Sequence, residues 1–122
     1  MTRTARPQAH DVFAVVDAMD VAALVSLFGP SGRLTFGNNA PLAGVEEIHR
    51  GATLFFETIS GLHHTIVHEW HVHGEIIIEL KVTYDRKDGQ QVTIPCVTIY
   101  RCDGDGKIDD YRVYFDMAPV YA

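Results

Sequence analysis

The sequence has few cysteines, few basic residues and no long hydrophobic run. Its 122 residues include two cysteines, Cys96 and Cys102. Both fall in one predicted strand, where six residues span about 20 Å, too far for a disulfide. We therefore expect a reduced protein with a cytoplasmic location. Ten basic residues against sixteen acidic ones leave a net charge of -6, which argues against nucleic acid or an anionic membrane as a partner.

Membrane, secretory and cofactor signals are also missing. No apolar segment approaches the roughly 20 residues that span a bilayer, and residues 1–7 contain two arginines but no secretory hydrophobic core. We expect residues 1–7 to form a flexible tail and residues 8–122 to form one domain. The chain has no Walker, dinucleotide-binding or Cys-x-x-Cys motif. The pair His71 and His73 lies at a predicted turn without a third ligand, so we expect neither a cofactor nor a metal site.

Long strands dominate the second half of the chain. Runs of strand-forming residues occupy 62–72, 75–85, 91–102 and 107–116, with glycine-containing turns between them. Helical periodicity occupies 10–19, 21–28 and 45–59, and 32–37 alternates like a strand. Helices followed by an antiparallel meander predict an α+β fold. Because the strands are about twice the usual length, we expect a curved antiparallel sheet wrapped around the three N-terminal helices.

The turn at Lys87-Asp88-Gly89 predicts which face of the sheet points inward. A three-residue loop with Gly89 in the left-handed conformation pairs Tyr84 with Val92. The inward face then carries Ile76, Ile78, Leu80, Val82, Tyr84, Ile94, Cys96, Thr98 and Tyr100. The alternative, a two-residue turn, would instead bury Glu79 and Lys81, which is costlier unless the two are paired.

The same reasoning assigns the two outer strands of the meander. In residues 62–72 it places His64, Ile66, His68 and Trp70 inward. In the last strand it places Asp109, Tyr111, Val113 and Phe115 on one face. The outer face of the sheet keeps Val67, Ile77, Val97, Ile99 and Tyr114. This is more apolar surface than a monomer normally exposes, so we expect a homodimer that forms through the outer face of the sheet.

Several motifs resemble those of a known superfamily. They are Phe36-Gly37-Asn38, Thr93-Ile94-Pro95, Tyr84-Asp85-Arg86-Lys87-Asp88-Gly89 and the segment 106–116. With the layout described above, they resemble the nuclear transport factor 2-like superfamily and its SnoaL-like branch, alongside limonene epoxide hydrolase and ketosteroid isomerase. The resemblance implies that the curved sheet forms a cone-shaped α+β barrel with an apolar cavity, often in a homodimer. It does not imply one activity, since this fold hosts many.

Most catalytic residues of these relatives are not matched in this sequence. The resemblance to ketosteroid isomerase places Phe36 at the base, Phe13 at the tyrosine and Thr98 at the acid. None of these can perform those roles, so we exclude that activity. The resemblance to limonene epoxide hydrolase places Val113 at the catalytic aspartate, while Asn38 is retained.

The residues themselves nominate a site. Either His64 or His68 could act as a general base or acid, because imidazole titrates near neutral pH. Tyr111 could donate a hydrogen bond to a ligand carbonyl, and Asp109 could act as a base. We expect the substrate-binding residues to be Asn38, Phe36, Trp70, Thr98, Tyr100, Val113 and Phe115. Each also has a structural interpretation: a core or rim histidine, a solvated carboxylate at the start of a strand, a turn residue or a pocket wall.

Two functional hypotheses follow. The first is a small enzyme, similar to polyketide cyclases, that performs cofactor-free acid–base chemistry on a hydrophobic, oxygenated small molecule. The reaction would be cyclisation, isomerisation, dehydration or hydrolysis. The second is a non-catalytic dimeric module that binds a ligand or serves a structural role. A cavity of about 300 Å³ or more, with one of the histidines facing Tyr111, would favour a ligand site.

Overall fold

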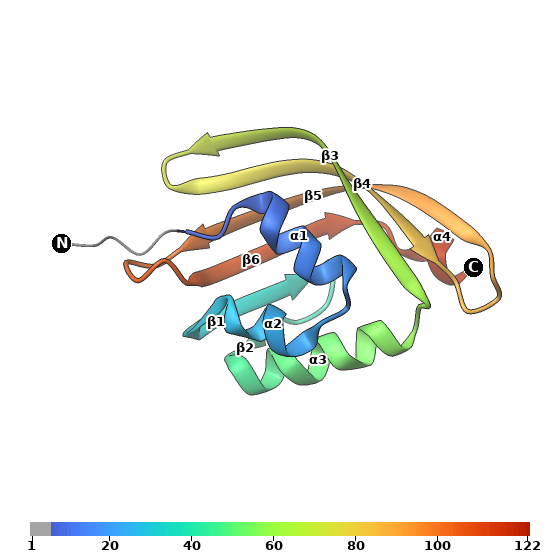
Figure 1. Ribbon diagram of the computed structural model, residues 1–122, viewed down its shortest axis with the longest axis horizontal. Coiled ribbons are helices and arrows are strands. Elements are labelled where there is room, and N and C mark those ends of the chain that lie inside the picture. The colour runs from blue at the N-terminus through green and yellow to red at the C-terminus, as the bar shows by residue number, and fades with distance from the viewer. Residues whose placement is uncertain (1–5) are drawn as a thin grey trace.

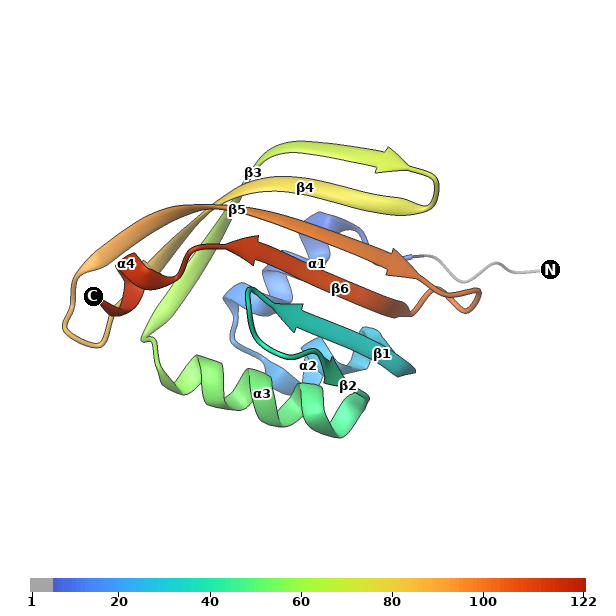
Figure 2. The same cartoon turned by 180° about the vertical axis from the view of Figure 1, so that it is seen from behind.

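The computed structural model describes residues 6–122 and confirms the predicted α+β fold class (Figure 1). The helices are α1 (Ala9–Asp17), α2 (Val21–Ser26), α3 (Val45–Glu57) and α4 (Ala118–Tyr121). The strands are β1 (Phe28–Phe36), β2 (Leu42–Ala43), β3 (Gly61–Val72), β4 (Glu75–Asp85), β5 (Gln91–Cys102) and β6 (Ile108–Phe115). The helices α1, α2 and α3 lie against one side of a curved sheet. Strands β3, β4 and β5 bend over these helices (Figures 1 and 2).

The six strands form one open sheet in the order β2-β1-β6-β5-β4-β3. The predicted cone is therefore not closed, and β2 and β3 lie at its edges. Strand β1 runs parallel to β6, whereas the other neighbouring pairs are antiparallel. The sequence analysis did not predict this parallel pair, because it connects segments that lie more than seventy residues apart.

The register at the β4–β5 hairpin is the predicted one. Gly89 has a φ of 87°, and Arg86 N–H donates to the Gln90 carbonyl at 2.8 Å. Tyr84 consequently pairs with Val92. All nine residues predicted for the inward face of this hairpin are buried, and Ile78, Leu80 and Val82 are at most 1% exposed. The apolar row faces the helices, and the alternative with Glu79 and Lys81 inside is excluded.

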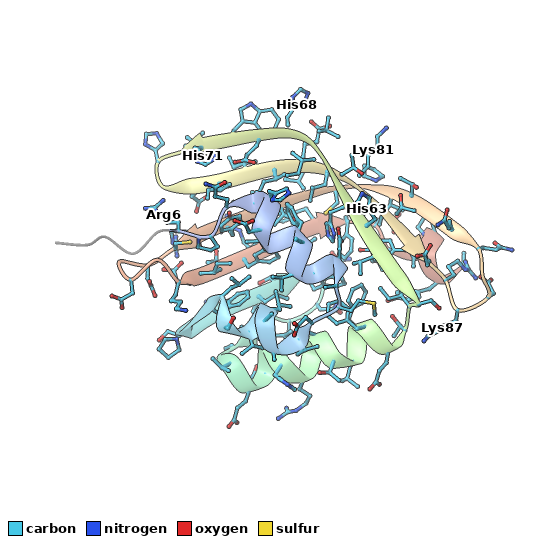
Figure 3. All side chains as sticks on the ribbon, viewed as in Figure 1. Arg6, His63, His68, His71, Lys81 and Lys87 are labelled. Atoms are coloured by element: carbon cyan, nitrogen blue, oxygen red, sulfur yellow. The ribbon has the colours of Figure 1, made fainter. Side chains whose placement is uncertain are left out.

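Strand β3 departs from the predicted register at one position. Ile66 pairs with Leu80 but His68 pairs with Glu79, so the chain has a bulge at Val67. A bulge adds one residue and reverses the direction of every later side chain. His68 and Trp70 therefore lie on the outer side of the sheet, contrary to the prediction. Figure 3 shows His68 pointing away from the helices.

Two other segments, the start of β1 and the C-terminal end, also differ from expectation. Phe28 was predicted to end the second helix, but it starts β1 and pairs with Ile108. The short helix α4 was not predicted. At the other end, the Pro7 carbonyl accepts a hydrogen bond from the Tyr100 hydroxyl at 2.8 Å. Residues 1–5 of the predicted tail lie outside the described residues. Within residues 6–122, no helix has the length and apolar character needed to cross a membrane.

Candidate functional site

A cavity of about 620 Å³ lies between the helices and the inward face of the sheet. Helices α1, α2 and α3, strands β1, β3, β4, β5 and β6, and residues 116–121 contribute to its wall. Most of the lining side chains are apolar. The polar ones are Asn38, Asn39, Thr58, His64, Tyr84, Thr98, Tyr111, Asp116 and Tyr121.

Aromatic rings form one wall of this cavity. The Phe36 ring lies 4.6 Å from Phe55 and 4.5 Å from Phe115, the latter edge-to-face. Tyr84 packs edge-to-face against Phe55 at 6.2 Å. Interlocked rings of this kind hold their positions well, so the wall is rigid and suits the flat face of a ligand.

His64 is the only histidine that residues 6–122 contribute to the cavity wall, and Asp17 holds it in place. Nδ1 of His64 lies 2.5 Å from Oδ1 of Asp17. The Asp17 carboxylate also accepts the backbone N–H of His64, at 3.1 Å to Oδ2. An ionised carboxylate can only accept hydrogen bonds, so Nδ1 carries a proton, and in the neutral imidazole Nε2 then presents its lone pair to the cavity. The pair has the arrangement of a general base with a carboxylate behind it.

Local structure explains how these two residues meet. Asp17 is the last residue of α1, which packs against β3. His64 lies on β3 before the bulge and so still points inward, where its ring stacks on Phe13 at 4.8 Å. Its side chain is 9% exposed. His63, the residue before it, points outward, and its Nδ1 lies 3.5 Å from Oδ2 of Asp17. His63 is labelled in Figure 3.

Neutral hydrogen-bonding groups lie deeper in the cavity. Burial raises the pKa of Tyr111, although a hydrogen bond with Thr98 acts in the opposite direction. Burial also raises the pKa of the Cys96 thiol to about 11, and its sulfur lies 3.9 Å from Oγ1 of Thr98. These groups therefore stay protonated at neutral pH and offer hydrogen-bond donors rather than charge.

The Tyr84 hydroxyl also lies in the cavity wall. Burial raises the pKa of Tyr84, and Cys96, Tyr121 and Asp17 add to the effect. No hydrogen bond joins this hydroxyl to another side chain or to the backbone within residues 6–122. In that part of the chain, Arg112 Nε is the one fully buried side-chain nitrogen or oxygen without a hydrogen-bond partner. The Tyr84 hydroxyl is therefore not fully buried. The Tyr84 hydroxyl and His64 Nε2 are therefore both open to the cavity.

The structure brings most of the predicted site residues to the cavity. Those in its wall are His64, Tyr111, Asn38, Phe36, Thr98, Val113 and Phe115. The sequence analysis did not select Asp17 or Tyr84. The Asp17–His64 pair joins positions 47 apart in the sequence, and nothing in the local pattern around Asp17 marks it. Tyr84 was predicted to face inward but was not selected as a site residue.

Four predicted site residues lie elsewhere, and their placement is corrected here. The bulge at Val67 turns His68 and Trp70 outward, and Trp70 is 47% exposed. Their rings lie 5.4 Å apart outside the cavity. Tyr100 faces inward but lies beyond the cavity, since its hydroxyl is bonded to Pro7.

Asp109 is the fourth residue outside the cavity. It falls at an irregularity in the β5–β6 pairing, where Arg101 pairs with Asp110 and Cys102 pairs with Ile108. This turns the Asp109 carboxylate to the surface, where Oδ1 accepts a hydrogen bond from Arg101 Nε at 3.1 Å. It is an ion-paired surface carboxylate and does not share the inward face with Tyr111.

The ionisable side chains in and behind the cavity wall are acidic, apart from His64. Among residues 6–122, no lysine or arginine lines the cavity, whereas Asp116 lies in the wall and Asp17 lies behind His64. Within residues 6–122, no three His, Cys, Asp or Glu side chains gather in a way that could hold a metal ion. An ionised carboxylate or phosphate would therefore meet no lysine or arginine from the described part of the chain in this wall.

Comparison with known proteins gives a consistent result for the fold. Residues 9–111 match the model of the SnoaL-like domain. A hypothetical protein from Catenulispora acidiphila DSM 44928 with a ketosteroid isomerase-like fold, solved with trimethylamine, superposes with a TM-score of 0.82 at 21% identity. The match covers 94% of this chain and 90% of that one.

Two further solved structures are similar. The epoxide hydrolase/cyclase-like enzyme SalBIII, which has a role in pyran ring formation in the polyether salinomycin, has a TM-score of 0.77 at 18% identity. The match covers 88% of this chain and 87% of that one. TerC, co-crystallised with polyporic acid, has a TM-score of 0.77 at 14% identity, with 90% and 89% covered. No curated protein matches the sequence. At these identities the structures establish the fold alone.

Proposed function

The protein belongs to the SnoaL-like family, and we propose that it is an enzyme that performs cofactor-free acid–base chemistry on a hydrophobic, oxygenated small molecule. The observation that carries this proposal is the Asp17–His64 pair, with His64 in the wall of a 620 Å³ cavity. A histidine held by a carboxylate can catalyse reactions that need only proton transfer, such as cyclisation, isomerisation, dehydration or hydrolysis.

His64 is the general base of the proposed reaction. Its Nε2 takes a proton from the substrate, and the Asp17 carboxylate stabilises the imidazolium that forms. Tyr111 and Asn38 orient the substrate through hydrogen bonds, and Phe36, Phe55 and Phe115 hold its flat apolar part. A largely apolar cavity strengthens each of these hydrogen bonds.

The wall also supports a substrate class. Without lysine or arginine in the wall, an uncharged ligand suits the cavity better than an anion. Two similar structures support the choice of an oxygenated small molecule, since one has a role in pyran ring formation and another was co-crystallised with polyporic acid.

A generic probe tests the base without knowledge of the natural substrate. 5-Nitrobenzisoxazole is small, flat and uncharged, and it opens to a coloured phenolate when a base removes its C3 proton. We expect the wild-type protein to open it faster than His64→Gln does, by about a hundredfold or more, as is typical of a positioned general base. His68→Gln is the matched control, because His68 lies outside the cavity, and its rate should equal that of the wild type. Equal rates in the wild type and His64→Gln would reject the base and favour a non-catalytic binding module.

We also propose that the protein forms a homodimer through the outer face of the sheet. Ile77, Val97 and Ile99 lie in a half-buried row on that face, and the side chains of Trp70 and Tyr114 are 47% and 53% exposed. Ile99→Glu should halve the mass measured by light scattering. Val45→Glu, which places the same charge at an exposed apolar position on α3, should leave the mass unchanged. A wild-type mass of one chain would reject the proposal.

A further inference from the structure

We infer that Tyr84 is a second catalytic residue, which donates a hydrogen bond to the substrate oxygen that becomes negative when His64 removes a proton. The inference rests on the proposed function, in which His64 is the base, and adds the group that stabilises the negative charge formed on the substrate. It differs from the sequence-based expectation, in which Tyr111 donates this hydrogen bond.

The register of the sheet places Tyr84 next to His64. His64 pairs with Val82 and Leu62 pairs with Tyr84, so His64 and Tyr84 are diagonal neighbours on the inward face. Diagonal neighbours have Cβ atoms about 7–8 Å apart, within reach of an aromatic side chain. A substrate of moderate size can therefore touch Nε2 of His64 and the Tyr84 hydroxyl at once.

Tyr111 lies farther along the sheet. It pairs with Tyr100, which pairs with Ile76. Ile76 is six residues from Val82 on β4, which corresponds to about 20 Å along the strand. The Tyr111 hydroxyl is also engaged by Thr98. The backbone of Tyr111 therefore lies farther from His64 than the backbone of Tyr84, which is its diagonal neighbour.

The state of the Tyr84 hydroxyl fits the role of a donor. It has no partner within residues 6–122 and is open to the cavity, so no existing hydrogen bond must be broken when a ligand binds. The ring is 3% exposed and packs edge-to-face on Phe55, so the hydroxyl is fixed in place. Burial raises the pKa of Tyr84, so the proton to be donated is present at neutral pH. A preorganised donor of this kind acts most strongly on charge that develops during the reaction.

The probe reaction shows where each bond and proton goes. Nε2 of His64 takes the C3 hydrogen of 5-nitrobenzisoxazole, and the electron pair of that C–H bond forms the nitrile. The N–O bond breaks, and its electrons remain on the phenolate oxygen. Tyr84 donates its hydrogen bond to this oxygen without transferring the proton, and the imidazolium later loses its proton to solvent.

The test compares three tyrosine variants in steady-state kinetics with this probe. We expect Tyr84→Phe to lower kcat about tenfold or more with little change in KM, because the hydrogen bond strengthens only as charge develops. Tyr111→Phe should lose at least threefold less in kcat. Tyr100→Phe is the matched control, since it removes a buried tyrosine hydroxyl outside the cavity, and its kcat should match the wild type.

The outcomes separate this inference from the proposed base. If His64→Gln is inactive while Tyr84→Phe keeps the wild-type kcat, the base stands and the inference is overturned. Equal losses in Tyr84→Phe and Tyr111→Phe would also overturn it. If Tyr84→Phe fails to fold by circular dichroism, the hydroxyl has a structural role and the inference is again overturned. If His64→Gln is as active as the wild type, the proposed function itself fails.

Discussion

The Asp17 carboxylate at the end of α1 holds His64 of β3 by both its ring and its backbone. Nδ1 of the ring lies 2.5 Å from Oδ1, and the backbone N–H lies 3.1 Å from Oδ2. A negative charge in the last turn of a helix is unfavourable by itself, because the helix dipole places negative charge there as well. The His64 contacts offset this cost, and the same contacts orient the ring for chemistry.

Replacement of the carboxylate should weaken the base without removing it. We expect Asp17→Asn to lower the rate of 5-nitrobenzisoxazole opening about tenfold or more, since a hydrogen bond to a charged group contributes about 1.5–3 kcal/mol. Asp11→Asn is the matched control on the same helix, since its exposed carboxylate lies beside His10, with Oδ1 at 3.3 Å from Nδ1. A wild-type rate in Asp17→Asn would show that His64 needs no carboxylate.

The left-handed turn at Gly89 should resist substitution for backbone reasons alone. A Cβ at Gly89 would meet no atom within 4 Å, but the φ of 87° is unfavourable for any other residue. We expect Gly89→Ala to lower the free energy of unfolding by about 1–2 kcal/mol in urea titrations. Gly104 has equal space around it without a positive φ, so Gly104→Ala should be neutral or slightly stabilising. Equal effects in the two variants would contradict this explanation.

The N-cap of α2 should contribute to stability through one hydrogen bond. Oδ1 of Asp20 accepts the backbone N–H of Ala23 at 3.0 Å. Asp20→Ala should cost about 1 kcal/mol of unfolding free energy. Gln8, the N-cap residue of α1, makes no such bond, and Gln8→Ala should change stability by less than about 0.5 kcal/mol. The measurement is chemical denaturation, and a larger loss in Gln8→Ala would reverse the assignment.

The Cys96 thiol should react slowly in the folded protein. Burial raises its pKa from 9.0 to about 11, and only the thiolate reacts with Ellman's reagent. In Cys102→Ser, where Cys96 is the remaining thiol, we expect the rate at pH 8 to be about a hundredfold lower folded than in urea. Because the folded pKa is the higher one, the contribution of this thiol to stability is complete below pH 9 and decreases as the pH rises toward 11. Equal rates in folded and unfolded protein would show that Cys96 is not buried.

Much of the fold could be predicted from the sequence, because its signals are local. The glycine at the β4–β5 turn and the alternation on both sides of it determine the pairing of Tyr84 with Val92, and the structure has that pairing. The family resemblance depends on the same strands and turns, and it correctly indicated the fold. Local signals also placed His64 on the inward face.

The tertiary structure alone decided which groups meet in the site. The bulge at Val67 cannot be seen in the alternation of β3, because both registers leave polar residues on each face. It depends on how the edge strand bends over the neighbouring layers, and it moved His68 and Trp70 out of the cavity. The contact between Asp17 and His64 likewise exists only once α1 packs on β3. Short-range patterns therefore determined the elements and their faces, whereas long-range packing determined the site, because a side-chain pair 47 residues apart leaves no mark in the sequence near either partner.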